Sequence, residues 1–207
     1  MKQTVLVGGG GHARSVVAMM EGSVRFLGYC DPKPSEGMTI PYLGTDDEVM
    51  ARYTPEEIRV HVAVGFNDGC RVDLRRRILR KFEAYEKTTL IAPSAWVAPG
   101  ATVGDGSAIM ARATVNVSSV AENVIVNTGA IIEHDCTIGR EAFIGPGAIV
   151  CGGSTIGSGA FIGAGATLVQ GTEIADDTVI GMGAVVASPL EDQPGVYLGI
   201  PAKKKKI

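Results

Sequence analysis

The chain has 207 residues and a formal net charge of −3 at pH 7. This slightly acidic balance gives no reason to expect a nucleic-acid partner, and no segment is long and apolar enough to insert into a membrane. Because the N-terminus also lacks an apolar leader, we predict a cytoplasmic protein. The cysteines form no CxxC pair, so we expect four reduced thiols: Cys30, Cys70, Cys136 and Cys151.

The sequence changes character near Leu90. Up to that point strand-like apolar runs alternate with helix-like segments, whereas nearly all of the later sequence is a short repeat. Most glycines belong to turns of this repeat, so the glycine content does not indicate disorder. We therefore predict two domains, a small Rossmann-like βαβ domain at 1–90 and an all-β repeat domain at 91–207.

A glycine loop opens the first domain. The apolar run Thr4–Val7 ends in Gly8–Gly11, and a helix is expected over 12–20. Such a loop offers backbone N–H groups and a positive helix end to an anion. With the later acid Asp31, at the end of a strand over 25–30, the loop formally satisfies the dinucleotide fingerprint GxGxxA. The domain has room for only half a dinucleotide fold, so a mononucleotide is expected; a tight turn without a ligand stays an alternative.

A third strand is expected over Ile58–Val64, which leads to Gly65 and Asn67 at the same carboxyl edge of the sheet. His61 lies within this strand and is expected to be packed rather than to bind a ligand. A helix is then expected over 71–85. Its buried residues should be Val72, Ile78, Leu79 and Phe82. Its cations should lie largely outside, as a solvated face: Arg75, Arg76, Arg77, Arg80 and Lys81.

The second domain has a period of six residues, which neither a helix nor a flat strand produces. An aliphatic residue recurs at Ile91, Val97, Val103, Ile109 and Val115, and then, after a shift by one residue, at Val120, Val126, Ile132, Ile138, Ile144, Val150, Ile156, Ile162, Leu168, Ile174, Ile180 and Val186. A mostly small residue precedes each by two places. This double period predicts a β-solenoid of about five coils, with the aliphatic side chains inside and a bulge or altered corner at the shift.

The repeat contains a single histidine, His134, and it lies between Glu133 and Asp135. Its place two residues after the inward Ile132 predicts a corner position. A histidine beside a carboxylate suits a general base, because the carboxylate can fix the imidazole tautomer and raise the basicity of the other ring nitrogen. A surface histidine on a turn is the alternative.

The chain resembles the hexapeptide-repeat sugar O- and N-acyltransferases, which acetylate sialic acid or nucleotide-linked 4-amino sugars. Four stretches carry the resemblance: Gly8–Arg14 (GGGGHAR), Tyr29–Pro32 (YCDP), Asn127–Gly139 (NTGAIIEHDCTIG) and Gly195–Lys203 (GVYLGIPAK). The resemblance implies a left-handed β-helix and a homotrimer with active sites between subunits. It also implies acetyl-CoA as co-substrate and no metal.

The same resemblance assigns residues to roles. It makes His134 the catalytic base, with Asp135 as its partner. The nucleotide sugar would be held at Gly10, Gly11, His12, Asp31 and Gly65. Acetyl-CoA would lie near Phe143, Gly152, Ala164, Met182 and Gly183. Phe143 stands where family members often carry a second histidine near the thioester, so its effect on activity is left open.

We predict N-acetylation of a nucleotide-linked 4-amino sugar by direct transfer, with a backbone N–H of Gly152 or Gly153 stabilising the oxyanion. O-acetylation of sialic acid or another sugar is the alternative. A zinc enzyme resembling the gamma-class carbonic anhydrases would need three histidines on one zinc, and the repeat has one. An NAD-dependent enzyme and a non-catalytic binding solenoid are the other rivals. The lysines at 203–206 are either a solvated tail or a partner for the phosphates of CoA.

Overall fold

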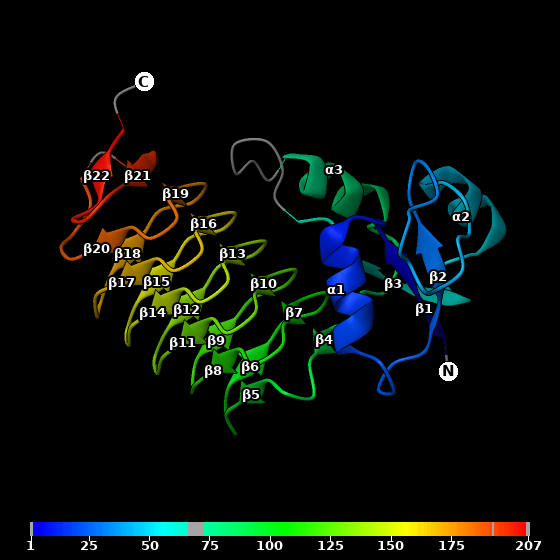
Figure 1. The fold of residues 1–207 in the computed structure, drawn as a ribbon, viewed down its shortest axis with the longest axis horizontal. Helices are drawn as coiled ribbons and strands as arrows, with labels where there is room; N and C mark the ends of the chain where they lie inside the picture. Colours follow the sequence, from blue (N-terminus) through cyan, green and yellow to red (C-terminus); the bar gives the residue numbers. More distant parts are fainter. Residues whose placement is uncertain (1, 66–72, 192, 206–207) are drawn as a thin grey trace. The chain divides into compact units, whose positions relative to one another are not determined.

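The computed structural model describes residues 2–65, 73–191 and 193–205. The chain divides into two compact units, Met1–Thr89 and Leu90–Ile207 (Figure 1). Within the described ranges, no helix has the length and hydropathy needed to cross a bilayer. Three cysteines are free thiols there, namely Cys30, Cys136 and Cys151, whereas Cys70 lies outside the described residues.

The first unit is built on a parallel sheet of strand order β2-β1-β3. Its strands are β1 (Gln3–Val7), β2 (Phe26–Cys30) and β3 (Ile58–Val62). The helices are α1 (Gly11–Met19), α2 (Asp46–Arg52) and α3 (Asp73–Lys81). The central strand contributes Val5 and Val7 to a core that α3 and the segment after it complete with Leu79, Phe82 and Tyr85. The order places the carboxyl ends of all three strands at one edge.

The ends of the helices differ in a way that matters for binding. At α2 a capping box closes the N-terminus, because the Thr45 side chain accepts from the Glu48 N–H while Glu48 accepts from the Thr45 N–H. At α1 the N-cap residue is Gly10, which has no side chain and so provides no side-chain cap. The first N–H groups of α1 therefore remain available to a ligand.

Two expectations about this unit have clear outcomes. His61 is fully buried, as predicted, and its Nδ1 lies 2.9 Å from the Thr88 carbonyl oxygen. The prediction that Arg75 lies outside is wrong: it is only 1% exposed and donates to the Val62 and Val64 carbonyl oxygens, at 2.6 and 2.9 Å. These carbonyls lie at the end of β3 and two residues beyond it, where a buried acceptor needs a donor. Asn67 and Val72 lie outside the described residues.

The second unit is a solenoid of two-residue strands stacked in three parallel ladders (Figure 1). The first face consists of β4 (Leu90–Ile91), β7 (Ala108–Ile109), β10 (Ile125–Val126), β13 (Phe143–Ile144), β16 (Phe161–Ile162) and β19 (Val179–Ile180), extended by β21 (Val196–Leu198) and β22 (Lys203–Lys204). The second face consists of β5 (Trp96–Val97), β8 (Thr114–Val115), β11 (Ile131–Ile132), β14 (Ile149–Val150), β17 (Thr167–Leu168) and β20 (Val185–Val186). The third face consists of β6 (Thr102–Val103), β9 (Ser119–Val120), β12 (Thr137–Ile138), β15 (Thr155–Ile156) and β18 (Glu173–Ile174).

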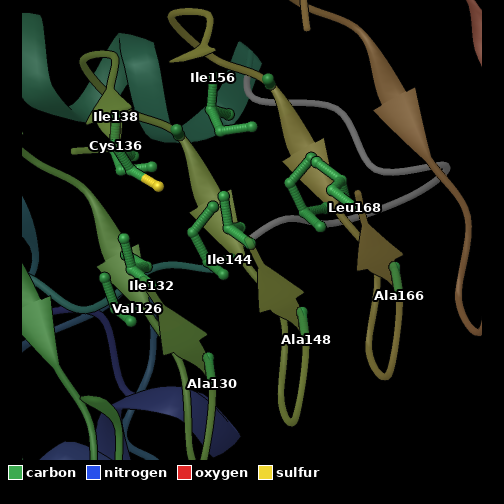
Figure 2. Close-up of a cluster of buried hydrophobic side chains, with 14 of the residues drawn as sticks. Val126, Ala130, Ile132, Cys136, Ile138, Ile144, Ala148, Ile156, Ala166 and Leu168 are labelled. Carbon is green, nitrogen blue, oxygen red and sulfur yellow. The ribbon is translucent and has the colours of Figure 1, made fainter. Parts of the chain in front are cut away.

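The six-residue period is confirmed as the core of the solenoid. Every aliphatic position from Ile109 to Val186 is buried, and so is every small position two places before it from Ser107 to Ala184. Figure 2 shows this packing, with Ile132, Ile144 and Ile156 pointing inward beside small residues such as Ala130 and Ala148. Ile91 differs from the prediction because it is 40% exposed; its strand β4 ends the ladder, so no further strand covers it.

The corners of the solenoid are equally regular, with one exception. Nearly every corner has four residues, and its third residue has a positive φ, as in Gly129 or Asp135. Paired strands are therefore usually 18 residues apart, as for Ile125 and Phe143, but Ala108 and Ile125 are only 17 apart. The corner at 116–118 has three residues instead of four, and none of them has a positive φ. This short corner is the irregularity that the sequence shift predicted.

Candidate active site

His134 lies on a corner of the solenoid, between β11 on the second face and β12 on the third. We call this set of corners the second edge. The His134 side chain is 56% exposed, and its Nδ1 lies 2.8 Å from Asp135 Oδ2. A carboxylate in this place accepts the Nδ1–H and leaves Nε2 as the basic nitrogen. The geometry therefore suits proton removal from a group that approaches the corner from solvent.

Gly152 lies next to the His134 ring, one coil further along the same edge. A Cβ at position 152 would lie 2.7 Å from His134 Cε1 and 2.8 Å from Nε2. Real Cβ atoms essentially never come this close, so only glycine lets the imidazole rest against the backbone here. The pair is therefore formed within one chain.

The structure separates the two expected oxyanion donors. The Gly153 N–H donates to the His134 carbonyl oxygen at 2.9 Å, so it is already used. The Gly152 N–H has no hydrogen-bond acceptor within the part of the chain that the structure describes, and Gly152 is buried beside the imidazole. Of the two, only the Gly152 N–H is available to a developing negative charge.

The residues expected to hold acetyl-CoA do not all lie together. Ala164, Met182 and Gly183 belong to corners that join the first face to the second, which we call the first edge. Gly152 is on the second edge with His134, so the second face separates it from that group. Met182 is 75% exposed at its corner. The predicted set is thus divided between two edges of the solenoid.

Phe143 lies on the first face, on the strand that leads into the first edge. Its ring is parallel to that of Phe161 on the neighbouring strand, with centroids 4.9 Å apart and planes 2° apart. The pair stacks as an aromatic ladder on the outer side of the face. At the position where a second histidine was expected by resemblance, the chain therefore has an apolar wall.

The first unit has a cavity of about 490 Å³ at the carboxyl edge of its sheet. All five residues expected to hold the nucleotide sugar line it: Gly10, Gly11, His12, Asp31 and Gly65. A Cβ on Gly10 would meet nothing within 4 Å, so the loop is open toward this space. The volume falls in the usual range for a small-molecule site, roughly 300–1,000 Å³.

Contacts around the loop explain its shape. Gly8 has φ +109°, a conformation that a side chain would strain. Asp31 Oδ2 accepts the Gly9 N–H at 2.8 Å, so this carboxylate holds the loop as well as facing the cavity. The sequence did not reveal this second role. Among the other lining residues, Gly8 belongs to the predicted loop, but the sequence did not reveal the rest: Pro32, Asp46, Ala63, Val64, Leu74 and Ile78.

His12 is neutral near pH 7. Burial lowers its pKa to about 4, and the nearby Arg75 charge adds to the effect. Its Nε2 is buried without a hydrogen-bond partner among the described residues. A neutral imidazole can donate one hydrogen bond and accept another, so His12 adds polarity without charge to the cavity that it lines.

Comparisons with known proteins support both halves of this description. The PglD N-terminal domain family matches residues 3–82, and the bacterial transferase hexapeptide family (six repeats) matches residues 153–188. The acetyltransferase domain of PglB from Neisseria gonorrhoeae is 32% identical over 99% of this chain and 100% of that one, with a TM-score of 0.89. The chain belongs to the hexapeptide-repeat sugar acyltransferase family.

Further structures extend the comparison for this acyltransferase. PerB from Caulobacter crescentus, in complex with CoA and GDP-perosamine, is 33% identical over 100% of this chain and 98% of that one, with a TM-score of 0.89. The PglB domain has also been solved with acetyl coenzyme A. Among curated protein sequences, none matches the chain.

These likenesses confirm the predicted fold of the acyltransferase, a Rossmann-like βαβ unit and a left-handed parallel β-helix. They also confirm the predicted enzyme class, the acetyl-CoA-dependent sugar N-acetyltransferases. Among the residues that the structure describes, no group of three or more His, Cys, Asp or Glu side chains is arranged to hold a metal ion.

Proposed function

We propose that this acyltransferase transfers the acetyl group of acetyl-CoA to the amino group of a nucleotide-linked 4-amino sugar. The observation that carries the proposal is the full-length likeness to PerB, a structure with both CoA and GDP-perosamine. Two features of the chain support it, namely the His134–Asp135 pair against Gly152 and the cavity at the glycine loop. O-acetylation stays the alternative and differs only in the acceptor atom.

The catalytic step is direct transfer. The amine attacks the thioester carbonyl carbon while His134 Nε2 takes one amine proton, and Asp135 Oδ2 stabilises the protonated ring through Nδ1. The carbonyl oxygen becomes negative in the tetrahedral intermediate and accepts the Gly152 N–H. The C–S bond then breaks, which releases CoA and leaves an amide. No covalent enzyme intermediate is needed, because a thioester is already activated.

The first unit binds the nucleotide part of the acceptor. The uncapped N–H groups of α1, beginning at Gly11, face a diphosphate. His12 and Gly65 line the same cavity and contact the rest of the nucleotide. Asp31 Oδ2 accepts the Gly9 N–H and Asp31 Oδ1 accepts the Lys33 N–H at 3.5 Å, and each oxygen has a further lone pair for a donor on the ligand.

Acetyl-CoA lies along the first edge, near Phe143, Ala164, Met182 and Gly183. The exposed Met182 and the aromatic wall at Phe143 offer apolar contacts to the pantetheine arm. Lys203 and Lys204 pair with β21, which extends the first face, and both are exposed. They are candidates for the phosphates of CoA, whereas Lys206 lies outside the described residues.

We assign a homotrimer to the acyltransferase, because the two halves of the site lie on different edges of one solenoid. A thioester held at the first edge of one chain meets His134 on the second edge of another. The outward strand positions support this arrangement. Those that stay partly exposed include apolar residues on the first face (Phe143, Val179) and on the second (Ile131, Ile149, Val185), whereas the third face carries exposed hydroxyl groups and Glu173.

We place the reaction in the cytoplasm, where acetyl-CoA is made. Three free thiols, at Cys30, Cys136 and Cys151, fit a reducing compartment.

Two experiments test the proposal. Purified protein is incubated with acetyl-CoA and GDP-perosamine, a UDP-linked 4-amino sugar or free sialic acid, and products are identified by mass spectrometry. We expect an N-acetyl product from a nucleotide-linked amine; acetylation of sialic acid alone would contradict the acceptor class.

The trimer is tested by mixing chains that carry His134→Ala with chains that carry Ala164→Trp and refolding them together. Mixed trimers should regain activity, whereas a stable, active monomer in light scattering would rule the trimer out.

A further inference from the structure

The turn that carries His134 is built differently from most other corners of the solenoid. In ordinary corners the fourth residue donates its N–H to the carbonyl of the first, as Ala130 does to Asn127 and Ala148 to Gly145, each at 3.0 Å. In the turn Glu133–Cys136 a side chain from the coil below takes this place. The Cys136 N–H donates to Ser118 Oγ at 2.9 Å, and Ser118 Oγ donates to the Glu133 carbonyl oxygen at 2.6 Å.

We propose that Ser118 is a positioning residue for His134. Its hydroxyl stands between the two ends of the catalytic turn and keeps them apart. This proposal rests on the proposed function only because it takes His134 as the catalytic base. The hydrogen bonds of Ser118 do not depend on that function.

Ser118 is the last residue of the short corner. It lies directly below the catalytic turn, as the bond from the Asp135 N–H to the Val117 carbonyl oxygen shows. The same corner also holds the Glu133 side chain, because Asn116 Nδ2 donates to Glu133 Oε2 at 3.1 Å. The one irregular corner of the repeat is thus the one that supports His134 from below, while Gly152 contacts the ring from the other side.

Loss of the Ser118 hydroxyl would move His134. Ser118 is only 7% exposed, so its two partners would be left buried without a hydrogen bond. The Cys136 N–H and the Glu133 carbonyl would then satisfy each other across the turn, as in an ordinary corner. This closure would draw the ends of the turn together and move His134 relative to Gly152. An error of about 1 Å in a catalytic group can lower the rate by roughly a hundredfold.

The chain contains a matched control. Ser107 is fully buried and bridges the corner Ala121–Val124 in the same way, accepting from the Val124 N–H at 3.0 Å and donating to the Ala121 carbonyl oxygen at 2.9 Å. That corner joins the third face to the first and carries no histidine. Ser107→Ala therefore removes the same chemistry from a turn with no part in the reaction.

The experiment compares Ser118→Ala with Ser107→Ala in steady-state assays with acetyl-CoA and GDP-perosamine or whichever amine the wild type accepts. Both variants should lose similar thermal stability. Only Ser118→Ala should lower kcat, by roughly tenfold to a hundredfold, with the KM for acetyl-CoA unchanged. Ser118→Thr should restore kcat, because the same column of the solenoid holds a threonine at Thr172. Ser118→Val, which has the shape of threonine without the hydroxyl, should not.

A second measurement needs no substrate. The ¹H–¹⁵N ring spectrum of His134, assigned with His134→Ala, should change in Ser118→Ala and Ser118→Val but not in Ser107→Ala or Ser118→Thr. If the wild type acetylates no amine, the proposed function fails and the spectra still decide the role of Ser118. Equal kinetic losses in the two alanine variants, or an unchanged His134 spectrum in Ser118→Ala, would overturn the proposal.

Discussion

The cavity of the first unit and the His134 corner of the solenoid organise their polar groups in opposite ways. In the first unit, burial sets the chemistry: desolvation holds the imidazoles of His12, in the cavity wall, and of His61, within β3, neutral, with pKa values of about 4 and 3. At the corner, His134 and Asp135 are 56% and 77% exposed, and stacked backbone turns set their position. Burial sets the charge state of the side chains in one region, and backbone geometry sets their position in the other.

The difference suggests a division of labour. A cavity whose walls are buried can select a ligand by shape and hydrogen bonds, because an unmatched polar group there is costly. An exposed corner on a rigid solenoid selects little, but it holds a base and an N–H donor at a fixed separation. We therefore expect substitutions at the corner to change turnover, whereas substitutions in the cavity should change folding or acceptor binding.

The largest expected effect is the loss of the base. His134→Ala should lower turnover by about a hundredfold or more, the scale of a lost general base, while the fold and acetyl-CoA affinity persist. Gln170→Ala is the matched control, since Gln170 is exposed at the same place in the next-but-one coil of that edge. Steady-state kinetics and calorimetric titration with acetyl-CoA measure both quantities. Wild-type turnover in His134→Ala would remove the corner from the catalytic site.

Gly152→Ala should act through crowding. The new methyl group would overlap the His134 ring, so turnover should fall by roughly tenfold or more, and the overpacking should cost about 1–3 kcal/mol of stability. The double variant His134→Ala/Gly152→Ala makes space for the methyl group. Its free energy of unfolding should therefore match that of His134→Ala alone. Additive losses in this cycle would show that the two residues do not share the space.

Acid should weaken the first unit more than the solenoid. Both buried histidines have folded-state pKa values below the 6.5 of an unperturbed imidazole, so the unfolded chain binds more protons in mild acid. Stability is complete above pH 6.5 and falls toward pH 4, by up to about 1.4 kcal/mol per pH unit for each histidine. Calorimetry across this range should show a flatter loss in His61→Asn, which keeps a donor to the Thr88 carbonyl. His134→Asn is the control, and an identical slope in both variants would contradict the assignment.

The smallest effect is expected at Asp135. Asp135→Asn keeps the backbone, because asparagine tolerates the positive φ of 60° at this position. Turnover should fall by roughly threefold to tenfold, since the exposed carboxylate is partly screened by solvent. Asp177→Asn is the control for the effect of an Asp-to-Asn change at a positive φ, because Asp177 has φ 55° in a corner far along the repeat. If the two variants behave alike, Asp135 has no role beyond the turn.

The solenoid was largely predictable because each residue in it depends on near neighbours. The period of six gives the inward residues, and the shift before Val120 gives the short corner. The first unit was less predictable, because its decisive contacts join distant segments. Arg75 belongs to a cationic helix face by sequence, and only its hydrogen bonds to the carbonyls of Val62 and Val64 explain its burial. The loop contact of Asp31 and the lining of the cavity by Leu74 have the same origin.

The candidate site shows the same limit. His134 and Asp135 could be recognised from their motif, and the five cavity residues followed from the carboxyl-edge rule and the resemblance. The choice of Gly152 over Gly153 as donor needed the structure, since it depends on which N–H is already bonded. The division of the acetyl-CoA residues between two edges also depends on counting corners around the coil. Ser118 had no signal beyond its place in a column of small residues.

The short corner has a consequence for redesign. Repeat proteins are commonly stabilised by moving each unit toward its consensus, and a consensus procedure applied here would insert one residue between Asn116 and Ser118. The edited chain would be the more regular of the two. It would also reshape the corner that lies directly below the base, so we expect this enzyme's most repetitive version to be its slower one.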